Sequence, residues 1–481
     1  MAELAGLTPK PRLASACESV HIPTAVNIVD LIFARSTAAH PAVVSPELQL
    51  TFGELQARMN GCAERLSADP AWPRKNRPRI GLDAPSGADY IVVALAILKQ
   101  NACFVPIPAE LTASERAQLA KSTALDAIVF AKSTEDWRIK AVAHDSPPAF
   151  DESALEALNP AFIRFSSGTT GASKGIVISH ETLLGRITAA NAGLRIGPED
   201  RVLWVLPMAH HFAVSIILYL YHGATTILAP ASDPKVMIEM MRTHGATVMY
   251  GSPYHYTMLS GQPDAESLGS LRLAISTAFA LTTEVAELFL SKTGLHLTQG
   301  MGIIEAGLPI LNLEHSKDKP TSIGKPQPAF EVKLDDGELM LRGPGIFDAY
   351  LTPWQPREAV LSDGWFATGD IAEMDQDGCL YLRGRVRSVV NVGGLKCFPE
   401  EVEAVLCSHP GVKAARVSGR AHPALGAMPS AEIIPQNVEA PPPMIELRKL
   451  CQERLSAYKV PLFYTFVSEL PLTPSGKLRR Y

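Results

Sequence analysis

Short apolar runs alternate with amphipathic stretches along most of this chain, and this alternation restricts its fold more than any other feature. The amphipathic stretches, such as residues 51–67 and 282–292, have the spacing of helices, and the apolar runs have the length of strands. Strands that alternate with helices form parallel sheets whose faces the helices cover, which predicts an α/β fold. The predicted strands are residues 79–82, 103–107, 126–130, 161–165, 175–178, 201–206, 225–228, 247–250 and 271–275.

The pattern changes after residue 320, where short strands and turns, such as residues 338–341 and 378–382, predict a small β-rich subdomain. Farther on, Pro399 and Glu400 predict the start of a helix, because proline fits the first turn and acids complement the helix dipole there. A chain of 481 residues is too long for a single core, so we expect several structural units.

The composition excludes several classes of protein. The formal net charge of −5 provides no basic face for nucleic acid. Seven scattered cysteines form no C-x-x-C pair, so they predict neither a disulfide framework nor a zinc site and indicate a reducing compartment, the cytoplasm. The first twelve residues lack the apolar core of a signal peptide. The longest apolar tract, residues 212–230, contains His222 and Gly223, so it predicts a buried helix and strand rather than a membrane span.

The segment from Ser166 to Lys174 carries the strongest chemical signal. It places five hydroxyl side chains, two glycines and one lysine in nine residues between two predicted strands. Glycines allow backbone N–H groups to approach a ligand closely, the hydroxyls add donors, and the lysine adds a positive charge. This composition suits a polyphosphate, although a solvated turn can have the same composition. The segment is not a Walker loop, because it lacks the G-x-x-x-x-G-K-[ST] pattern.

The string Ser166–Gly175 resembles the phosphate loop of the adenylate-forming superfamily, which includes acyl- and aryl-CoA synthetases, adenylation domains of peptide synthetases, and luciferases. Further matches follow in the expected order from Thr51 to Lys477. The resemblance implies a large N-terminal domain over residues 1–384, with two βα subdomains and the β-rich subdomain, and a small mobile α+β domain over residues 385–481. It also implies that ATP phosphates are bound by Ser166, Ser167, Gly168, Thr169, Thr170, Gly171 and Lys174.

Joining a carboxylic acid to ATP brings two anions together. Like charges about 4 Å apart repel by about 4 kcal/mol at an effective dielectric constant near 20, so cations must stabilise the reaction centre. By the resemblance, Glu305 holds Mg²⁺ on the phosphates, and Lys477 contacts the carboxylate and the α-phosphate. With His210, these are the predicted catalytic residues.

The resemblance also places the nucleoside. Asp370 is expected to hold the ribose hydroxyls, with Arg385 beside it. The adenine is expected near Ala278, Gly300 and Met301. The superfamily usually has glycines around Ala278 and an aromatic residue at the position of Met301. It usually has a threonine that contacts phosphate at the position of Ile304, so this chain departs from the pattern at sites that bear on activity.

A C-terminal segment resembles the part that swings over the active site for thioester formation. Gly393 and Gly394 would let a pantetheine arm pass close to the backbone, although a plain turn has the same sequence. Arg387 takes the place of the superfamily's aspartate or lysine hinge.

The string Leu206–Phe212 resembles the segment that gates and lines the acyl site, and it adds His211 and Phe212 to Gly302 as predicted substrate contacts. No aspartate for a substrate amine lies between His210 and Tyr221, which argues against amino acids. The apolar neighbours suit an aliphatic or an aromatic acid equally.

These features predict an ATP-dependent ligase that forms an acyl- or aryl-adenylate and then a thioester with CoA or phosphopantetheine. A carrier protein, where one is used, is expected to be a separate chain. Two alternatives remain: an ATP-binding homologue with reduced or no ligase activity, which Met301 and Ile304 suggest, and a luciferase-like oxidase, which nothing specific favours.

Overall fold

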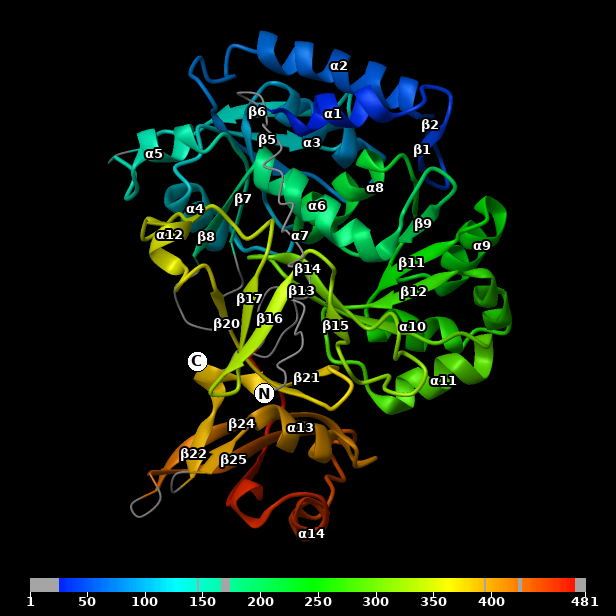
Figure 1. The fold of residues 1–481 in the computed structure, drawn as a ribbon, viewed down its shortest axis with the longest axis vertical. Coiled ribbons are helices and arrows are strands. Elements are labelled where there is room, and N and C mark those ends of the chain that lie inside the picture. The colour runs from blue at the N-terminus through cyan, green and yellow to red at the C-terminus, as the bar shows by residue number, and fades with distance from the viewer. Residues whose placement is uncertain (1–25, 145–146, 166–173, 393–394, 423–425, 472–481) are drawn as a thin grey trace, which may run out of the picture.

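The computed structural model describes residues 26–144, 147–165, 174–392, 395–422 and 426–471. This part of the chain contains two large sheets, a four-stranded antiparallel sheet and a separate C-terminal sheet. Figure 1 shows the C-terminal sheet and its helices at one end of the molecule, beyond the four-stranded sheet. The predicted α/β fold, with a large N-terminal part and a smaller C-terminal part, is confirmed. The domain boundary between residues 384 and 385 stays a prediction.

The first large sheet has nine strands in the described residues, and its central strands are parallel. In spatial order the strands are β15 (Lys325–Pro326), β14 (Gly307–Leu311), β13 (Thr298–Ile303), β12 (Leu273–Ser276), β11 (Val248–Gly251), β9 (Arg201–Trp204), β10 (Thr225–Leu228), β1 (Pro41–Val44) and β2 (Gln49–Thr51).

The second large sheet has eight strands in the described residues. In spatial order they are β19 (Gln355–Pro356), β18 (Ala349–Tyr350), β8 (Gly175–Ser179), β7 (Pro160–Phe165), β4 (Cys103–Pro106), β3 (Arg79–Asp83), β5 (Ala127–Ala131) and β6 (Trp137–Ala141). Its centre is parallel, but β7 and β8 are antiparallel neighbours.

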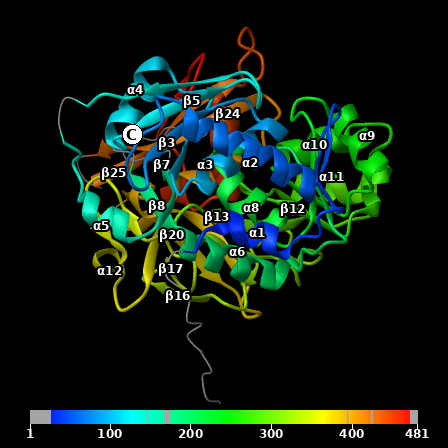
Figure 2. The same ribbon diagram turned by 90° about the horizontal axis from the view of Figure 1, so that it is seen from above.

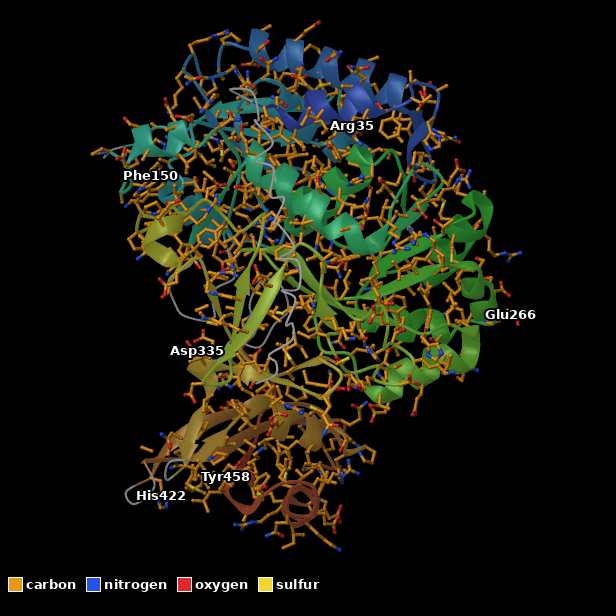
Figure 3. The ribbon with its side chains drawn as sticks, viewed as in Figure 1. Arg35, Phe150, Glu266, Asp335, His422 and Tyr458 are labelled. Carbon is orange, nitrogen blue, oxygen red and sulfur yellow. The ribbon has the colours of Figure 1, made fainter. Side chains whose placement is uncertain are left out.

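Helices that pack against the two large sheets meet in one core. The helices α3 (Ala88–Lys99), α6 (His180–Leu194) and α8 (Ile217–Tyr221) share one apolar cluster with strands of both large sheets. A second cluster joins α9 (Pro234–His244), α10 (Pro253–Ser260) and α11 (Thr283–Thr293) to the other face of the nine-stranded sheet. Figure 2 shows α3 and α8 between the strands of the eight-stranded sheet and α9–α11, and Figure 3 shows that side chains fill this interior.

Local sequence explains where these helices begin. The helix α2 (Phe52–Ala68) starts at Thr51, whose side chain accepts from the Glu54 N–H while the Glu54 carboxylate accepts from the Thr51 N–H. This capping box satisfies two N–H groups that the helix itself cannot pair. The helix predicted over residues 51–67 is therefore confirmed, as is the one over 282–292, which is α11.

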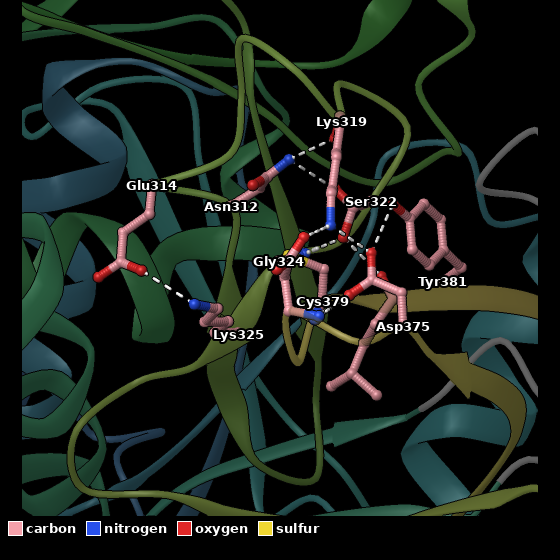
Figure 4. A network of polar contacts seen from close by, with 11 residues as sticks. Asn312, Glu314, Lys319, Ser322, Gly324, Lys325, Asp375, Cys379 and Tyr381 are labelled. Atoms are coloured by element: carbon pink, nitrogen blue, oxygen red, sulfur yellow. Dashed lines mark hydrogen bonds and ion pairs between the residues drawn. The ribbon is translucent and has the colours of Figure 1, made fainter.

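The β-rich subdomain is an antiparallel sheet of β16 (Glu331–Asp335), β17 (Glu338–Arg342), β20 (Phe366–Met374) and β21 (Leu380–Arg385). A polar network fixes the chain before it against the turn between β20 and β21 (Figure 4). The Lys319 ammonium lies 2.6 Å from the Asp375 carboxylate and 2.5 Å from that of Asp377. The Asn312 side chain donates to the carbonyl oxygens of Lys319 and Ser322.

The C-terminal part has its own core. Its sheet contains β22 (Val390–Val392), β23 (Leu395–Cys397), β24 (Val412–His422), β25 (Gly426–Pro435) and β26 (Phe463–Phe466), with α13 (Pro399–Cys407) and α14 (Met444–Arg454). Apolar side chains from these elements form a separate cluster. Proline occupies the first turn of α13, as the sequence predicts.

Two findings bear on the class of protein. No helix within the described ranges is long and apolar enough to cross a membrane, and the tract from residue 212 to 230 forms short helical segments followed by β10. Six cysteines fall within these ranges, and all six are free thiols.

Candidate functional site

The candidate phosphate segment joins two strand ends that lie side by side, because Phe165 is the register partner of Gly175. Lys174, at the end of the segment, places its ammonium 4.3 Å from the centre of the Tyr350 ring, a cation–π contact. Tyr350 belongs to β18, which pairs with β8, so the lysine is held at the edge of the same sheet. The predicted phosphate contacts Ser166, Ser167, Gly168, Thr169, Thr170 and Gly171 lie outside the described residues.

Glu305 lies in the turn between β13 and β14 and is half-buried, and the charges of three arginines act on it. Burial raises the pKa of its carboxyl, whereas its own backbone N–H and the charges of Arg385, Arg186 and Arg164 lower it. These arginines come from β21, α6 and β7. The turn therefore presents one carboxylate in a field of positive charge, which suits a polyphosphate with a metal ion.

Arg186 holds the backbone of this turn. Its guanidinium donates to the carbonyl oxygens of Ile304 (2.8 Å), Glu305 (3.0 Å) and Gly345 (2.9 and 2.7 Å). The side chain is 1% exposed, and burial lowers its pKa to about 10, so it remains a cation at neutral pH. Gly307 and Gly345 both have φ of +83°, and a Cβ at either would lie 2.6 Å from Arg186 atoms. Both glycines are therefore needed for the arginine to fit.

Asp370 and Arg385 form the predicted ribose pair. They are register partners on β20 and β21, and Arg385 Nε lies 2.6 Å from Asp370 Oδ1. Asp370 is 5% exposed, whereas half of the Arg385 side chain is accessible. The structure thus brings these two predicted residues together.

His210 is held from two sides. It lies in the short helix α7 (Met208–His211), and its ring Nε2 lies 2.5 Å from the Glu110 carboxylate. Arg164 donates to the His210 carbonyl oxygen and lies 3.2 Å from its Nδ1. Because the arginine can only donate, Nδ1 accepts and Nε2 carries the proton donated to Glu110. Burial lowers the pKa of Arg164 to about 10, and the nearby Glu305 opposes this shift.

The predicted acid contacts approach one group of rings. The His211 ring meets the Trp204 ring edge-on, with centres 5.7 Å apart. Gly302 is exposed, and a Cβ there would lie 3.7 Å from the Thr277 hydroxyl and 4.0 Å from the Tyr250 hydroxyl. Phe212 is buried and packs edge-on against Tyr90. His211 and Gly302 therefore lie beside register partners of β9 and β11, Trp204 and Tyr250, and Phe212 belongs to the core.

Two of the predicted adenine contacts lie within a strand. Gly300 and Met301 belong to β13, as does Gly302. Met301 is 5% exposed and is part of the apolar core. Ala278 is exposed with φ of +72°, the left-handed backbone that normally requires glycine. This explains why glycines are usual here and shows that the turn keeps its shape without them.

Three of the remaining predicted residues lie outside the described residues: Gly393, Gly394 and Lys477. Arg387 lies in a single 3₁₀ turn, Val386–Ser388, between β21 and β22.

Sequence reasoning missed four residues of this site: Glu110, Arg164, Arg186 and Tyr350. A signal existed for both arginines, because each interrupts an apolar stretch, and buried charges must find partners. Glu110 and Tyr350 carry no such signal.

Comparisons with known proteins agree with this geometry. The chain matches the model of AMP-binding enzymes over residues 32–351 and that of the AMP-binding enzyme C-terminal domain over residues 401–477. It is 30% identical over 348 residues to the 2-succinylbenzoate–CoA ligase of Bacillus licheniformis, covering 70% of this chain and 72% of that protein. It is 27% identical over 483 residues to the feruloyl-CoA synthase of an Amycolatopsis species, covering 92% and 95%. The match to the long-chain fatty acid–CoA ligase of Bacillus subtilis, at 30% identity, spans 60% of that protein.

Solved structures show the same fold. The o-succinylbenzoate CoA synthetase of Bacillus subtilis, in complex with its acyl-adenylate intermediate, superposes with a TM-score of 0.81 at 24% identity, over 94% of this chain and 97% of that chain. ATP-bound MatB of Rhodopseudomonas palustris gives a TM-score of 0.79 at 22% identity over the same shares. With the family match over residues 32–351 and the C-terminal match after it, the chain belongs to the AMP-binding enzymes, the adenylate-forming family that its sequence predicts.

Proposed function

We propose that the protein is an ATP-dependent carboxylic-acid ligase. It forms an acyl- or aryl-adenylate with release of pyrophosphate, and then a thioester with CoA or with the phosphopantetheine of a separate carrier protein. The observation that carries this proposal is the position of Glu305 among Arg164, Arg186 and Arg385, with Arg385 also bound to Asp370. This arrangement joins a carboxylate for a metal ion, cations for phosphates and a carboxylate for a ribose.

Mg²⁺ fits this site. The ion usually binds through one or two carboxylates together with substrate phosphates, so it needs no cage of protein ligands. Within the described ranges no three His, Cys, Asp or Glu side chains could form such a cage, and Glu305 is the carboxylate on which the charges of the three arginines act. When bound by Glu305 and phosphates, Mg²⁺ would neutralise charge on the phosphates and polarise them.

The protein side chains divide the remaining work. Lys174 and the segment from Ser166 to Gly171 would bind the phosphates, and Asp370 would accept hydrogen bonds from the ribose hydroxyls. Lys477 would stabilise the charge that develops between the carboxylate and the α-phosphate, a role proposed from its sequence context alone. His210, fixed by Arg164 and Glu110, would border the carboxylate and the path of the thiol.

The two half-reactions would use different positions of the C-terminal domain. We place the domain boundary at residues 384/385 and the hinge at Arg387, in the 3₁₀ turn between β21 and β22. Gly393 and Gly394 would line the path of the pantetheine arm. Such a domain movement would order the two steps and keep the adenylate from water.

The acid would be an aliphatic or aromatic carboxylic acid, as the names of the relatives suggest. They include ligases of long-chain fatty acids, 2-succinylbenzoate and, at 27% identity, a feruloyl-CoA synthase. The free thiols of the described residues are consistent with work in the cytoplasm, where we place the protein.

Acid-dependent exchange of pyrophosphate into ATP tests the proposal. The wild type should catalyse exchange with at least one acid from a panel of fatty, benzoic, cinnamic and amino acids, and should then form a thioester when CoA or a carrier protein is added. Lys477→Ala should abolish exchange while the melting temperature stays unchanged. A wild type that binds ATP but exchanges with no acid would instead support the homologue without ligase activity, for which Ile304 provides the motivation, since it offers no hydrogen bond.

A further inference from the structure

Two segments predicted to contact the acid meet at a single pair of aromatic rings. Trp204 and Tyr250 are register partners on the adjacent parallel strands β9 and β11, and their rings stack with centres 5.7 Å apart and planes at 18°. His211 packs edge-on against Trp204, and the exposed Gly302 faces the Tyr250 hydroxyl. The ring pair therefore connects His211, which contacts Trp204, with Gly302, which lies beside the Tyr250 hydroxyl.

The rings of Trp204 and Tyr250 are almost completely buried. Trp204 is 2% exposed and Tyr250 is 7% exposed. Tyr219, also 2% exposed, packs edge-on against Trp204 with ring centres 6.0 Å apart. A long alkyl chain that passed the exposed Gly302 would meet these buried rings. The surroundings of Gly302 accordingly suit an acid of limited length.

The two rings also carry polar groups. The Tyr250 hydroxyl is hydrogen-bonded to the Thr277 hydroxyl, and both face Gly302. The Trp204 indole N–H is buried and has no hydrogen-bond partner among the residues that the structure describes. A buried donor without a partner is unfavourable, so a ligand oxygen that reached it would be bound favourably, whereas a methylene chain would leave these groups unsatisfied.

We propose that the acid is a compact aromatic one with a hydroxyl or similar oxygen on its ring, and not a long-chain fatty acid. This inference rests on the proposed ligase function and narrows it. The ring of the acid would pack against His211 and Tyr250, since aromatic pairs favour offset and edge-on contacts. Its ring oxygen would bond to the Tyr250–Thr277 hydroxyl pair or to the Trp204 N–H.

The first test compares acids in the exchange assay. The panel contains benzoic and cinnamic acids, their ring-hydroxylated derivatives, and fatty acids from butanoic to hexadecanoic acid. The ring-hydroxylated acids should have kcat/KM at least about tenfold above their unsubstituted parents, the size expected for one hydrogen bond. Exchange that is fastest with dodecanoic or hexadecanoic acid would overturn the inference while leaving the ligase function intact.

The second test uses variants of the ring pair. Tyr250→Phe should lower the ratio of kcat/KM between a hydroxylated acid and its parent about tenfold, because it removes one donor and keeps the ring. Tyr256→Phe is the matched control, since this buried hydroxyl donates to the Met249 and Ile275 carbonyl oxygens on the opposite face of the sheet. Trp204→Ala should extend activity to longer acids. An unchanged ratio in Tyr250→Phe, with no gain of longer acids in Trp204→Ala, would refute the inference.

A third measurement separates this inference from the ligase function. If no acid supports exchange, the ligase proposal fails, and the binding of acids is then measured by the rise in melting temperature that each acid causes. A hydroxylated aromatic acid should still stabilise the wild type more than Tyr250→Phe. Equal stabilisation of both proteins, or stabilisation only by long fatty acids, would refute the inference on its own.

Discussion

Removing the Arg186 guanidinium tests how the fold positions Glu305. Arg186→Met keeps most of the side-chain volume but removes four N–H···O bonds to three backbone carbonyl oxygens. Each buried carbonyl oxygen that is left without a donor costs about 1–3 kcal/mol of unfolding free energy. The Glu305 carbonyl oxygen would keep one donor, the Phe347 N–H at 2.7 Å, so the turn should loosen without losing its fold.

The catalytic effect should be larger than the loss of stability alone would cause. A displacement of about 1 Å in a reacting group can reduce the rate by about 100-fold, and Arg186→Met should lower kcat by a factor between about 10 and 100. The half-saturating concentration of Mg²⁺ should rise as well. The charge of Arg186 also lowers the pKa of Glu305, so its loss should raise that pKa further and move the acidic limb of the exchange rate to higher pH.

The assay combines the exchange rate at varied Mg²⁺ and pH with the melting temperature. Arg79→Met is a matched control, because Arg79 is another buried arginine, 3% exposed, that donates to the Ala124 carbonyl oxygen and the Glu152 carboxylate. Both variants should be destabilised, but only Arg186→Met should need more Mg²⁺ and show the shifted acidic limb. If the two variants behave alike in Mg²⁺ and pH dependence, Arg186 merely stabilises the fold and the reasoning is refuted.

Three further predictions follow from individual contacts. Glu110→Ala should lower kcat about tenfold without changing the KM for ATP, because it frees the His210 ring; an unchanged kcat would contradict this role. Burial lowers the pKa of His180 to about 4, so the unfolded chain binds a proton at a higher pH than the folded one, and stability should fall by about 3 kcal/mol from pH 6.5 to pH 4. His180→Gln should flatten that pH dependence in calorimetry. Ala278→Gly should raise the unfolding free energy by about 0.5–1 kcal/mol in urea denaturation, because a left-handed alanine is strained; a loss of stability would show that no strain is present.

The fold could be predicted because its elements depend on local patterns. Thr51 and Glu54 cap a helix within one turn, and the short apolar runs at residues 79–82 and 103–107 form the strands β3 and β4. The strand β13 was missed because Gly300 and Gly302 give it the composition of a turn. A Cβ at Gly300 would lie 2.8 Å from the Leu311 side chain, so the glycine there serves close packing, which no local pattern reveals.

The site could be predicted only in part, and the reason is the distance along the chain between its components. Motif residues such as Glu305 and Asp370 can be recognised from their neighbours in the sequence. Arg186, in contrast, donates to the Glu305 carbonyl oxygen across 119 positions of the chain. An arginine within an apolar helix or strand does predict a buried charge that needs partners, but the sequence does not say which partners. Arg164 finds its partner in His210, and Arg186 finds its partner in the turn that carries Glu305. Charge near Glu305 is thus a property of the tertiary fold, and a substitution at either arginine can alter the reaction centre while every motif residue stays in place.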